Sequence, residues 1–178
     1  MQKNDKELEI RIYSIATTAN DAIVFLEEMQ GIRLLPVWIG PLEGQAIAIK
    51  FSGIALPRPF THDLMSEIIS KAGYKMTKVV IDNVVDNTYY SSIYISNGKD
   101  THQIDSRPSD AIAMSVRTGC SIYITEQVLN RSQVLNKPIS NQEVEEFKTK
   151  LKDLKPTDIF KDLEKKNQAK KEKPKDNQ

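Results

Sequence analysis

The sequence predicts an α+β domain in which helices pack on a largely antiparallel or mixed sheet. Apolar and polar residues alternate in several short segments, which is the period of a half-buried strand. Other segments carry apolar residues at helical spacing between proline and glycine boundaries. With 178 residues, the chain is long enough for one domain with a single substantial core.

Seven segments have strand-like patterns. In the first, Leu8, Ile10 and Ile12 alternate with polar residues. Asp86-Asn87 predicts the turn of a hairpin, and Asn97-Gly98 predicts the next turn. The expected strands cover residues 8–14, 22–26, 33–39, 76–85, 89–95, 100–104 and 121–124.

Two of the three expected helices begin with proline. Pro41 opens a helix that Gly53 ends, and Pro108 opens another that Gly119 ends. Proline is tolerated in the first helical turn because its missing N–H would have no partner inside the helix. Small and apolar residues in the middle of the first helix predict burial against the sheet.

The third helix is expected over residues 62–72, with Thr61 as its N-cap and Gly73 as its stop. It has an apolar stripe formed by Leu64, Met65, Ile68, Ile69 and Ala72.

The order of three strands followed by a helix occurs twice, which raises the question of an internal duplication. An offset of 67 aligns Pro41 with Pro108 and Glu43 with Asp110, whereas an offset of 65 aligns Ile39 with Ile104. The two registers conflict. Either an ancient strand-strand-strand-helix unit was duplicated or two helices converged on similar N-terminal chemistry.

The predicted domain organisation has three parts. Residues 1–135 form the domain, 136–160 a helical extension, and 161–178 a disordered tail rich in lysine. The extension has a narrow apolar stripe made by Val144, Phe147, Leu151 and Leu154. This stripe either packs on its own domain or docks a partner subunit.

Composition excludes several classes of protein. Seven lysines and four acids in residues 161–178 leave residues 1–160 with a formal charge of −2, so the body is not a basic nucleic-acid-binding surface by composition. Cys120 is the single cysteine, which excludes an intramolecular disulfide and a thiolate zinc cluster. No apolar run approaches the ~20 residues of a membrane span, and no signal-peptide core is visible, so a cytoplasmic location without membrane attachment is expected.

The start of the helix at Pro108 is the strongest local candidate for a functional site in the sequence. Asp105, Arg107 and Asp110 surround this start, and Arg107 lies between strand and helix. Backbone N–H groups and a guanidinium can converge there on one anion. The alternative is that Asp110 caps the helix and Arg107 only pairs with Asp105 or Asp110.

Three blocks together carry a family resemblance: residues 35–48 (LPVWIGPLEGQAIA), 58–64 (RPFTHDL) and 104–113 (IDSRPSDAIA). In order and spacing they resemble the bifunctional nuclease family, over roughly residues 8–130. The resemblance implies an α+β domain, homo-oligomer formation, and activity against DNA and RNA as described for plant members. The helical motif that some relatives share with excision-repair nuclease subunits is not evident here.

Hydrolysis of a phosphodiester needs an activated water and stabilisation of charge on the phosphate oxygens, and carboxylate-bound Mg²⁺ or Mn²⁺ commonly supplies the first. The blocks contain suitable groups for both tasks. The candidate catalytic residues are Glu43, His62, Asp63, Asp105, Arg107 and Asp110. The candidate phosphate-binding residues are Arg58, Arg107 and Ser109.

Both histidines have alternative interpretations. His62 is either a general acid or base or a half-exposed residue packed beside Pro59 and Phe60. For His102 a role outside the site is favoured, because strand alternation places it on the face opposite Asp105.

Three hypotheses therefore compete. The first is a nuclease of low sequence specificity, assisted by Mg²⁺ or Mn²⁺, with two helix starts meeting in a cleft. The second is a noncatalytic oligomeric module that binds an anionic ligand or a protein partner. The third is structural: Asp105, Arg107 and Asp110 form a buried ion-pair cluster that fixes the turn.

Overall fold

The computed structural model describes residues 5–18 and 20–137, and it confirms the α+β class. Its strands are β1 (Glu7–Thr17), β2 (Ala22–Glu28), β3 (Arg33–Ile39), β4 (Lys75–Val85), β5 (Thr88–Ser96), β6 (Thr101–Ser106), β7 (Ser121–Thr125) and β8 (Leu135–Asn136). Its helices are α1 (Pro41–Phe51), α2 (Thr61–Lys71), α3 (Pro108–Thr118) and α4 (Glu126–Arg131). The short elements α4 and β8 lie where the sequence pattern is weak, and they were not predicted.

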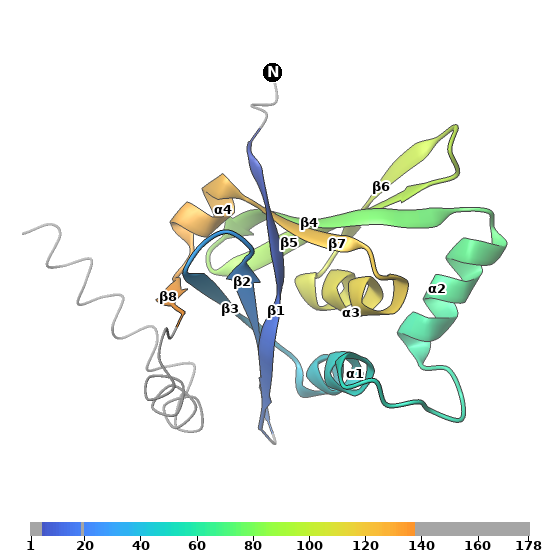
Figure 1. Cartoon of the computed structure of the whole chain (residues 1–178), viewed down its shortest axis with the longest axis horizontal. Helices are drawn as coiled ribbons and strands as arrows, with labels where there is room; N and C mark the ends of the chain where they lie inside the picture. The colour runs from blue at the N-terminus through green and yellow to red at the C-terminus, as the bar shows by residue number, and fades with distance from the viewer. Residues whose placement is uncertain (1–4, 19, 138–178) are drawn as a thin grey trace, which may run out of the picture. The chain divides into compact units, whose positions relative to one another are not determined.

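The strands form one mixed sheet of eight strands in the order β6-β5-β4-β7-β1-β2-β3-β8. Only the β4–β7 pair is parallel among the described strands; the other neighbours are antiparallel. Two antiparallel meanders, β1–β3 and β4–β6, thus flank β7 and are each followed by a helix that begins with proline (Figure 1). The repeated order is consistent with a duplication, which stays a prediction.

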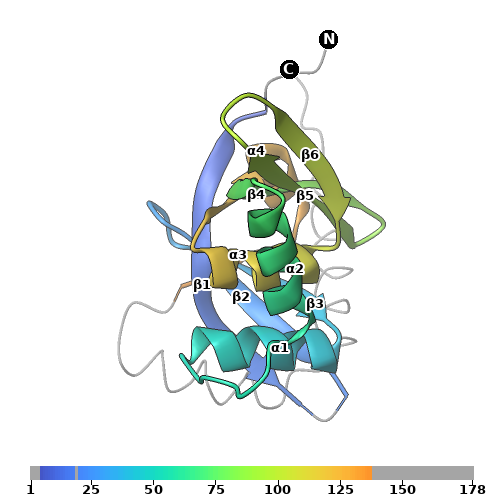
Figure 2. The same cartoon turned by 90° about the vertical axis from the view of Figure 1, so that its right-hand side faces the viewer.

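Helix α3 forms the centre of the helical layer. It lies between the β4–β5 strands and α1, and α2 crosses its outer side (Figure 2). Ala111, Ile112, Ala113 and Met114 of α3 are completely buried in the core. The start of α3 is therefore held rigidly against the sheet, which fixes the position of the polar residues around it.

Helix α1 packs against β2 at very short range. A Cβ atom built on Gly44 would lie 2.2 Å from the Cβ of Ala22, so only glycine fits at this crossing. Ile47, one turn later, is buried in the same core. The expected burial of this helix against the sheet is confirmed at Ile47, whereas Ala46, Ala48 and Ile49 are only partly buried.

Helix α2 is present as predicted, but its environment and its cap differ from expectation. Phe60 has the extended N-cap conformation and Thr61 is already helical, so the expected N-cap was wrong by one residue. None of the α2 residues is buried, and Leu64 and Ile68 are 50% and 58% exposed. Only part of the apolar stripe contacts the core, through Ile69.

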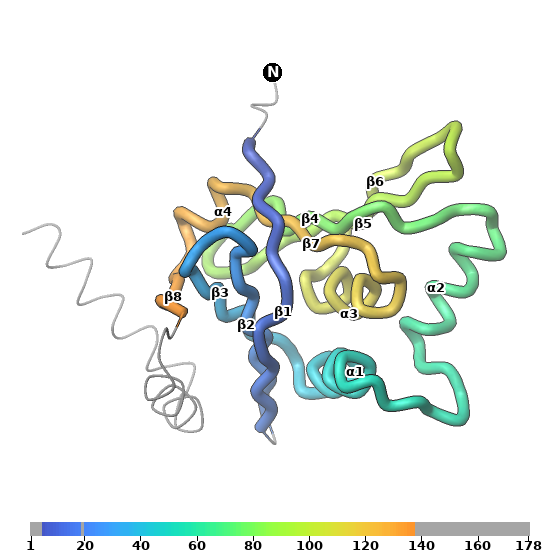
Figure 3. The backbone as a smooth tube through the Cα atoms, viewed as in Figure 1, coloured from blue at the N-terminus to red at the C-terminus, as the bar shows by residue number. Residues whose placement is uncertain are grey.

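The tube in Figure 3 follows the chain from β3 through α1 and a connecting segment into α2. No helix in the described part of the chain has the length and apolar character needed to span a membrane. The predicted helical extension, apart from residues 136–137, and the lysine-rich tail lie outside the described residues.

Candidate functional site

Three helix starts meet on one side of the domain. Gly40 and Arg107, which precede α1 and α3, both have extended backbone conformations that turn a strand into a helix with proline at its first position. A cavity of about 580 Å³ lies between these starts and the start of α2. It is lined by Leu42, Glu43, Gln45, Ala46, Pro59, Phe60, Thr61, His62, Met65, Arg107 and Asp110.

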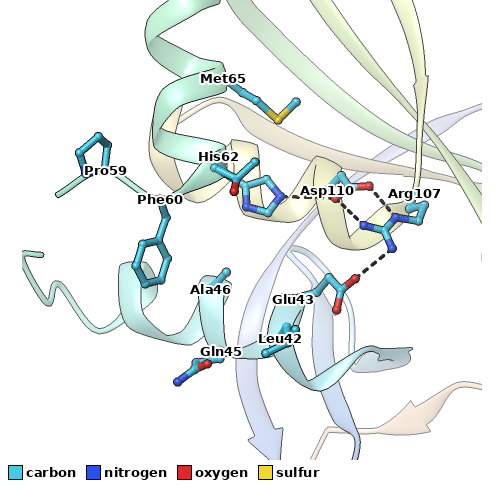
Figure 4. Close-up of a pocket in the computed structure, with 11 residues that line it drawn as sticks. Leu42, Glu43, Gln45, Ala46, Pro59, Phe60, His62, Met65, Arg107 and Asp110 are labelled. Carbon is cyan, nitrogen blue, oxygen red and sulfur yellow. Dashed lines mark hydrogen bonds and ion pairs between the residues drawn. The ribbon is translucent and has the colours of Figure 1, made fainter.

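A chain of polar contacts crosses this cavity (Figure 4). Arg107 donates from Nε to Asp110 Oδ2 at 2.7 Å and from Nη2 to Asp110 Oδ1 at 3.0 Å. Its Nη1 donates to Glu43 Oε1 at 2.9 Å. On the other side of the carboxylate, His62 Nε2 lies 3.4 Å from Asp110 Oδ1. The chain joins all three helices, so residues that lie 64 positions apart in the sequence act in one place.

The charges in the cavity stabilise each other. Hydrogen bonding from Arg107 is the main reason why the pKa of the Asp110 carboxyl lies below its ordinary value, and the contact with His62 acts in the same direction, against partial burial. The two carboxylates raise the pKa of Arg107 further above its already high value. Asp110 is therefore ionised and Arg107 protonated throughout the physiological range.

Arg107 keeps the capacity to bind a ligand. Its guanidinium has five N–H donors, and three of them are used by Asp110 and Glu43, so two remain. Its side chain is 65% exposed, whereas that of His62 is only 12% exposed. An anion that enters the cavity can reach the guanidinium without breaking the contacts that orient it.

The structure brings four of the candidate catalytic residues together and places the other two elsewhere. Asp63 lines a neighbouring cavity instead, where its Oδ1 accepts from Arg117 Nε at 3.0 Å and its Oδ2 accepts from the backbone N–H of Phe60 at 2.9 Å. Asp105 lies on β6 opposite Ser92 and is exposed. It does not line the main cavity.

No single cavity is lined by all three candidate phosphate-binding residues. Arg107 lines the main cavity, and Arg58 lines the neighbouring one. Ser109 is buried and lines a third cavity beside Trp38 and Tyr89, and Arg107 lines this third cavity as well.

The structure agrees only in part with the third hypothesis, a buried ion-pair cluster of Asp105, Arg107 and Asp110. The Arg107–Asp110 pair forms, but the guanidinium is exposed rather than buried. Within residues 5–18 and 20–137, Asp105 takes no part in this ion-pair cluster. The other histidine, His102, contacts the hydroxyl of Tyr74 at 3.2 Å, away from the cavity.

Sequence reasoning missed Arg117 and the apolar residues of the cavity wall. The side chain of Arg117 is 3% exposed and also donates to the carbonyl oxygens of Ala113 and Ala46 at 2.9 and 3.2 Å. A signal existed, because Arg117 follows Asp110 by seven residues, which is two helical turns and therefore the same face of α3. Phe60 and Met65 gave no comparable signal.

The acidic and histidine side chains do not form a ready metal site. In the described part of the chain, no group of three or more His, Cys, Asp or Glu side chains is arranged to hold a metal ion. Glu43, His62 and Asp110 are close to one another, but the Arg107 guanidinium occupies the space between the two carboxylates. As arranged, these residues suit an arginine-bound anion better than a metal ion.

The sequence of residues 24–137 matches the model of the bifunctional nuclease domain. The chain belongs to this family. The match includes every residue that lines the main cavity, so the site described above lies within the family's defining region.

Relatives of this bifunctional nuclease domain protein occur in bacteria and plants. An uncharacterized protein of Mycobacterium tuberculosis is 32% identical over 162 residues, which cover 85% of this chain and 97% of the relative. Bifunctional nuclease 1 of Oryza sativa subsp. japonica is 28% identical over 131 residues, which cover 72% of this chain and 38% of the plant protein. Bifunctional nuclease 1 of Arabidopsis thaliana is 24% identical over 107 residues, covering 58% and 33%. The plant relatives thus contain long regions without a counterpart in the alignment.

Proposed function

We propose that this protein is a nuclease of low sequence specificity that hydrolyses phosphodiester bonds in DNA and RNA at the cavity between α1, α2 and α3. The observation that carries the proposal is the contact chain His62–Asp110–Arg107–Glu43, in which an arginine with free donors lies next to a histidine–carboxylate pair. Family membership and the names of the plant relatives support the same reaction class.

In the proposed reaction, Arg107 binds a nonbridging phosphate oxygen through its two remaining N–H groups. The ionised Asp110 accepts a hydrogen bond from His62 Nε2 and so orients the imidazole with its Nδ1 lone pair available. His62 Nδ1 takes a proton from water as the water oxygen attacks phosphorus. The bond from phosphorus to the leaving sugar oxygen then breaks, this oxygen takes a proton from solvent water, and the imidazolium returns its proton to solvent.

Assistance by Mg²⁺ or Mn²⁺ stays a separate prediction. Glu43 and Asp110 offer the oxygen ligands that these ions prefer, but both carboxylates are paired with Arg107. The proposed steps therefore rest on protein side chains alone. Hydrolysis measured with Mg²⁺, with Mn²⁺ and with a chelator tests the metal requirement independently of the side-chain roles.

The decisive experiment is nicking of supercoiled plasmid and cleavage of single-stranded RNA by the wild-type protein and by His62→Gln. We expect His62→Gln to lose about 10²–10⁴-fold in rate, the usual contribution of a general base. The matched control is His102→Gln, which removes an imidazole outside the cavity and should retain full activity. Equal rates for wild type and His62→Gln would indicate a contaminating nuclease or a different base.

A second candidate function is noncatalytic binding of an anionic ligand or a protein partner at the same cavity. It is favoured by the pairing of Glu43 and Asp110 with Arg107, which leaves neither carboxylate free to act as a base. Tight binding of an oligonucleotide without turnover, weakened by Arg107→Ala, would support this function over hydrolysis.

Homo-oligomer formation is part of the proposal. It is supported by α2, which has no buried residue and exposes Leu64 and Ile68 outside the three cavities described above. An exposed apolar helix face of this kind is typical of a subunit contact. Light scattering after size exclusion should give a mass above 20.2 kDa for the wild type and a lower mass for Ile68→Glu. A monomeric wild type would contradict it.

A further inference from the structure

A second cavity of about 360 Å³ lies next to the main one, and Pro59 lines both. It is formed by the end of α1, the segment between α1 and α2, the start of α2 and the end of α3. Its polar lining consists of three cationic side chains, Lys50, Arg58 and Arg117, and one acid, Asp63.

The charges in the second cavity do not cancel. Both oxygens of Asp63 are already used, by Arg117 Nε and by the backbone N–H of Phe60. Arg117 neutralises Asp63, and it is fixed further by carbonyl oxygens of α1 and α3. Within residues 5–18 and 20–137, neither Lys50 nor Arg58 forms an ion pair. Two cations without ion-pair partners therefore line one cavity, in which the Arg117–Asp63 pair is held in place by further hydrogen bonds.

The rest of the lining is apolar. Ile54 and Leu56 are 54% and 37% exposed, and Pro57 lies beside them. Exposed apolar side chains next to unpaired cations suit a ligand that has an anionic part and a flat apolar part. A nucleotide has both, as phosphate and base.

We propose that the second cavity binds a nucleotide that flanks the scissile phosphate of a single-stranded nucleic acid. The inference rests on the proposed function, because it assumes that the scissile phosphate binds at Arg107. Lys50 and Arg58 bind the flanking phosphate, and Ile54 and Leu56 contact the unpaired base. A base that is paired and stacked in a duplex cannot enter such a cavity, so single strands are the preferred substrate class.

The test uses the full chain and a fluorescent oligothymidylate of about 12 nucleotides, whose binding is followed by anisotropy at several salt concentrations. The test variant is Lys50→Gln/Arg58→Gln. The control variant, Lys75→Gln/Lys99→Gln, removes the same charge from exposed positions outside both cavities. All four side chains lie in exposed residues, so each variant should remain folded.

We expect the test variant to bind the single strand about tenfold more weakly than the wild type. The slope of log K against log salt should become less steep by roughly 0.7–1.4, which is the contribution of one or two phosphate contacts. The control variant should match the wild type. Binding of a duplex of the same length, and competition by polyglutamate, should differ little between the test variant and the wild type.

Equal losses in the test and control variants, or an equal loss for single strand, duplex and polyglutamate, would overturn the inference. So would absence of single-strand binding by the wild type. These results are distinguishable from failure of the proposed function, because they concern binding, whereas cleavage is measured separately. If the wild type bound single strands through Lys50 and Arg58 but cleaved no substrate, the proposed nuclease activity would be refuted. Binding of single strands at the second cavity would still be supported.

Discussion

Arg117 Nε donates to Asp63 Oδ1 at 3.0 Å, and the same guanidinium binds carbonyl oxygens of α1 and α3. One buried side chain thus ties together the three helices whose starts form the main cavity. Through Asp63, which also accepts the backbone N–H of Phe60, the contact fixes the first turn of α2 and with it His62. Asp63 is better explained as a residue that positions the site than as one that reacts.

Arg117→Met should therefore destabilise the protein. The substitution leaves the Asp63 carboxylate and two carbonyl oxygens without their donor, and loss of one partner of a buried ion pair costs about 3 kcal/mol of the free energy of unfolding. Urea unfolding followed by circular dichroism measures this cost. The matched control is Arg58→Met, an exposed arginine without an ion pair in the described part of the chain, which should change stability by less than about 0.5 kcal/mol.

Gly44→Ala should also destabilise the fold, through the contact between α1 and β2. Its new Cβ would lie 2.2 Å from the Cβ of Ala22, so the helix must move away from the sheet, at a cost of about 1–3 kcal/mol. Adding Ala22→Gly removes the clash and should recover part of the loss in the same unfolding measurement. If Gly44→Ala were as stable as the wild type, α1 would not pack on β2 at this distance.

The two acids beside Arg107 can be distinguished by substitution. Asp110 contacts both Arg107 and His62, whereas Asp105 lies on β6 outside the lining of the main cavity. We expect Asp110→Asn to lower plasmid nicking by about 10²-fold or more, because the imidazole loses the carboxylate that orients it. Asp105→Asn should keep near wild-type activity. If Asp105→Asn lost activity and Asp110→Asn kept it, the catalytic carboxylate would instead be that of Asp105 on β6.

Most of the fold was predictable because local pattern determines it. Alternation gave the strands, and prolines and glycines marked α1 and α3 closely. The partial exposure of α2 was not predictable. An apolar stripe indicates that one face of a helix is buried, but it does not identify the element or subunit that packs against this face. The order of strands around β7 depends on long-range pairing, which local pattern does not contain.

The same distinction applies to the site. Its residue types came from three sequence blocks, and the structure brings Glu43, His62, Arg107 and Asp110 together from all three. Local sequence could not separate Asp110 from Asp105, which are five residues apart on different elements. The role of Arg117 depends on partners 54 and 71 positions away. Only tertiary packing reveals it.

The lowered pKa of Asp110 predicts how the ion pair with Arg107 contributes to stability as pH changes. Hydrogen bonding from Arg107, the main cause, holds the folded-state pKa below the ordinary value of 3.8. A carboxyl with a depressed folded pKa stabilises the fold fully above its unfolded pKa, and this contribution is lost as pH falls through the folded value. Asp110→Asn should therefore be less stable than wild type by roughly 1 kcal/mol at about pH 6, a modest figure because the Arg107 side chain is exposed.

The difference in the free energy of unfolding between wild type and Asp110→Asn should shrink below pH 3.8. It should approach zero at lower pH, where the protonated Asp110 of the wild type is as neutral as the asparagine of the variant. Urea midpoints measured at about pH 6, 4.5 and 3 follow this change. Asp105→Asn serves as the control for general acid effects, because it removes an exposed carboxylate outside the ion-pair cluster. A stability difference for Asp110→Asn that stays constant across this range would show that the carboxylate charge is not what stabilises the turn between β6 and α3.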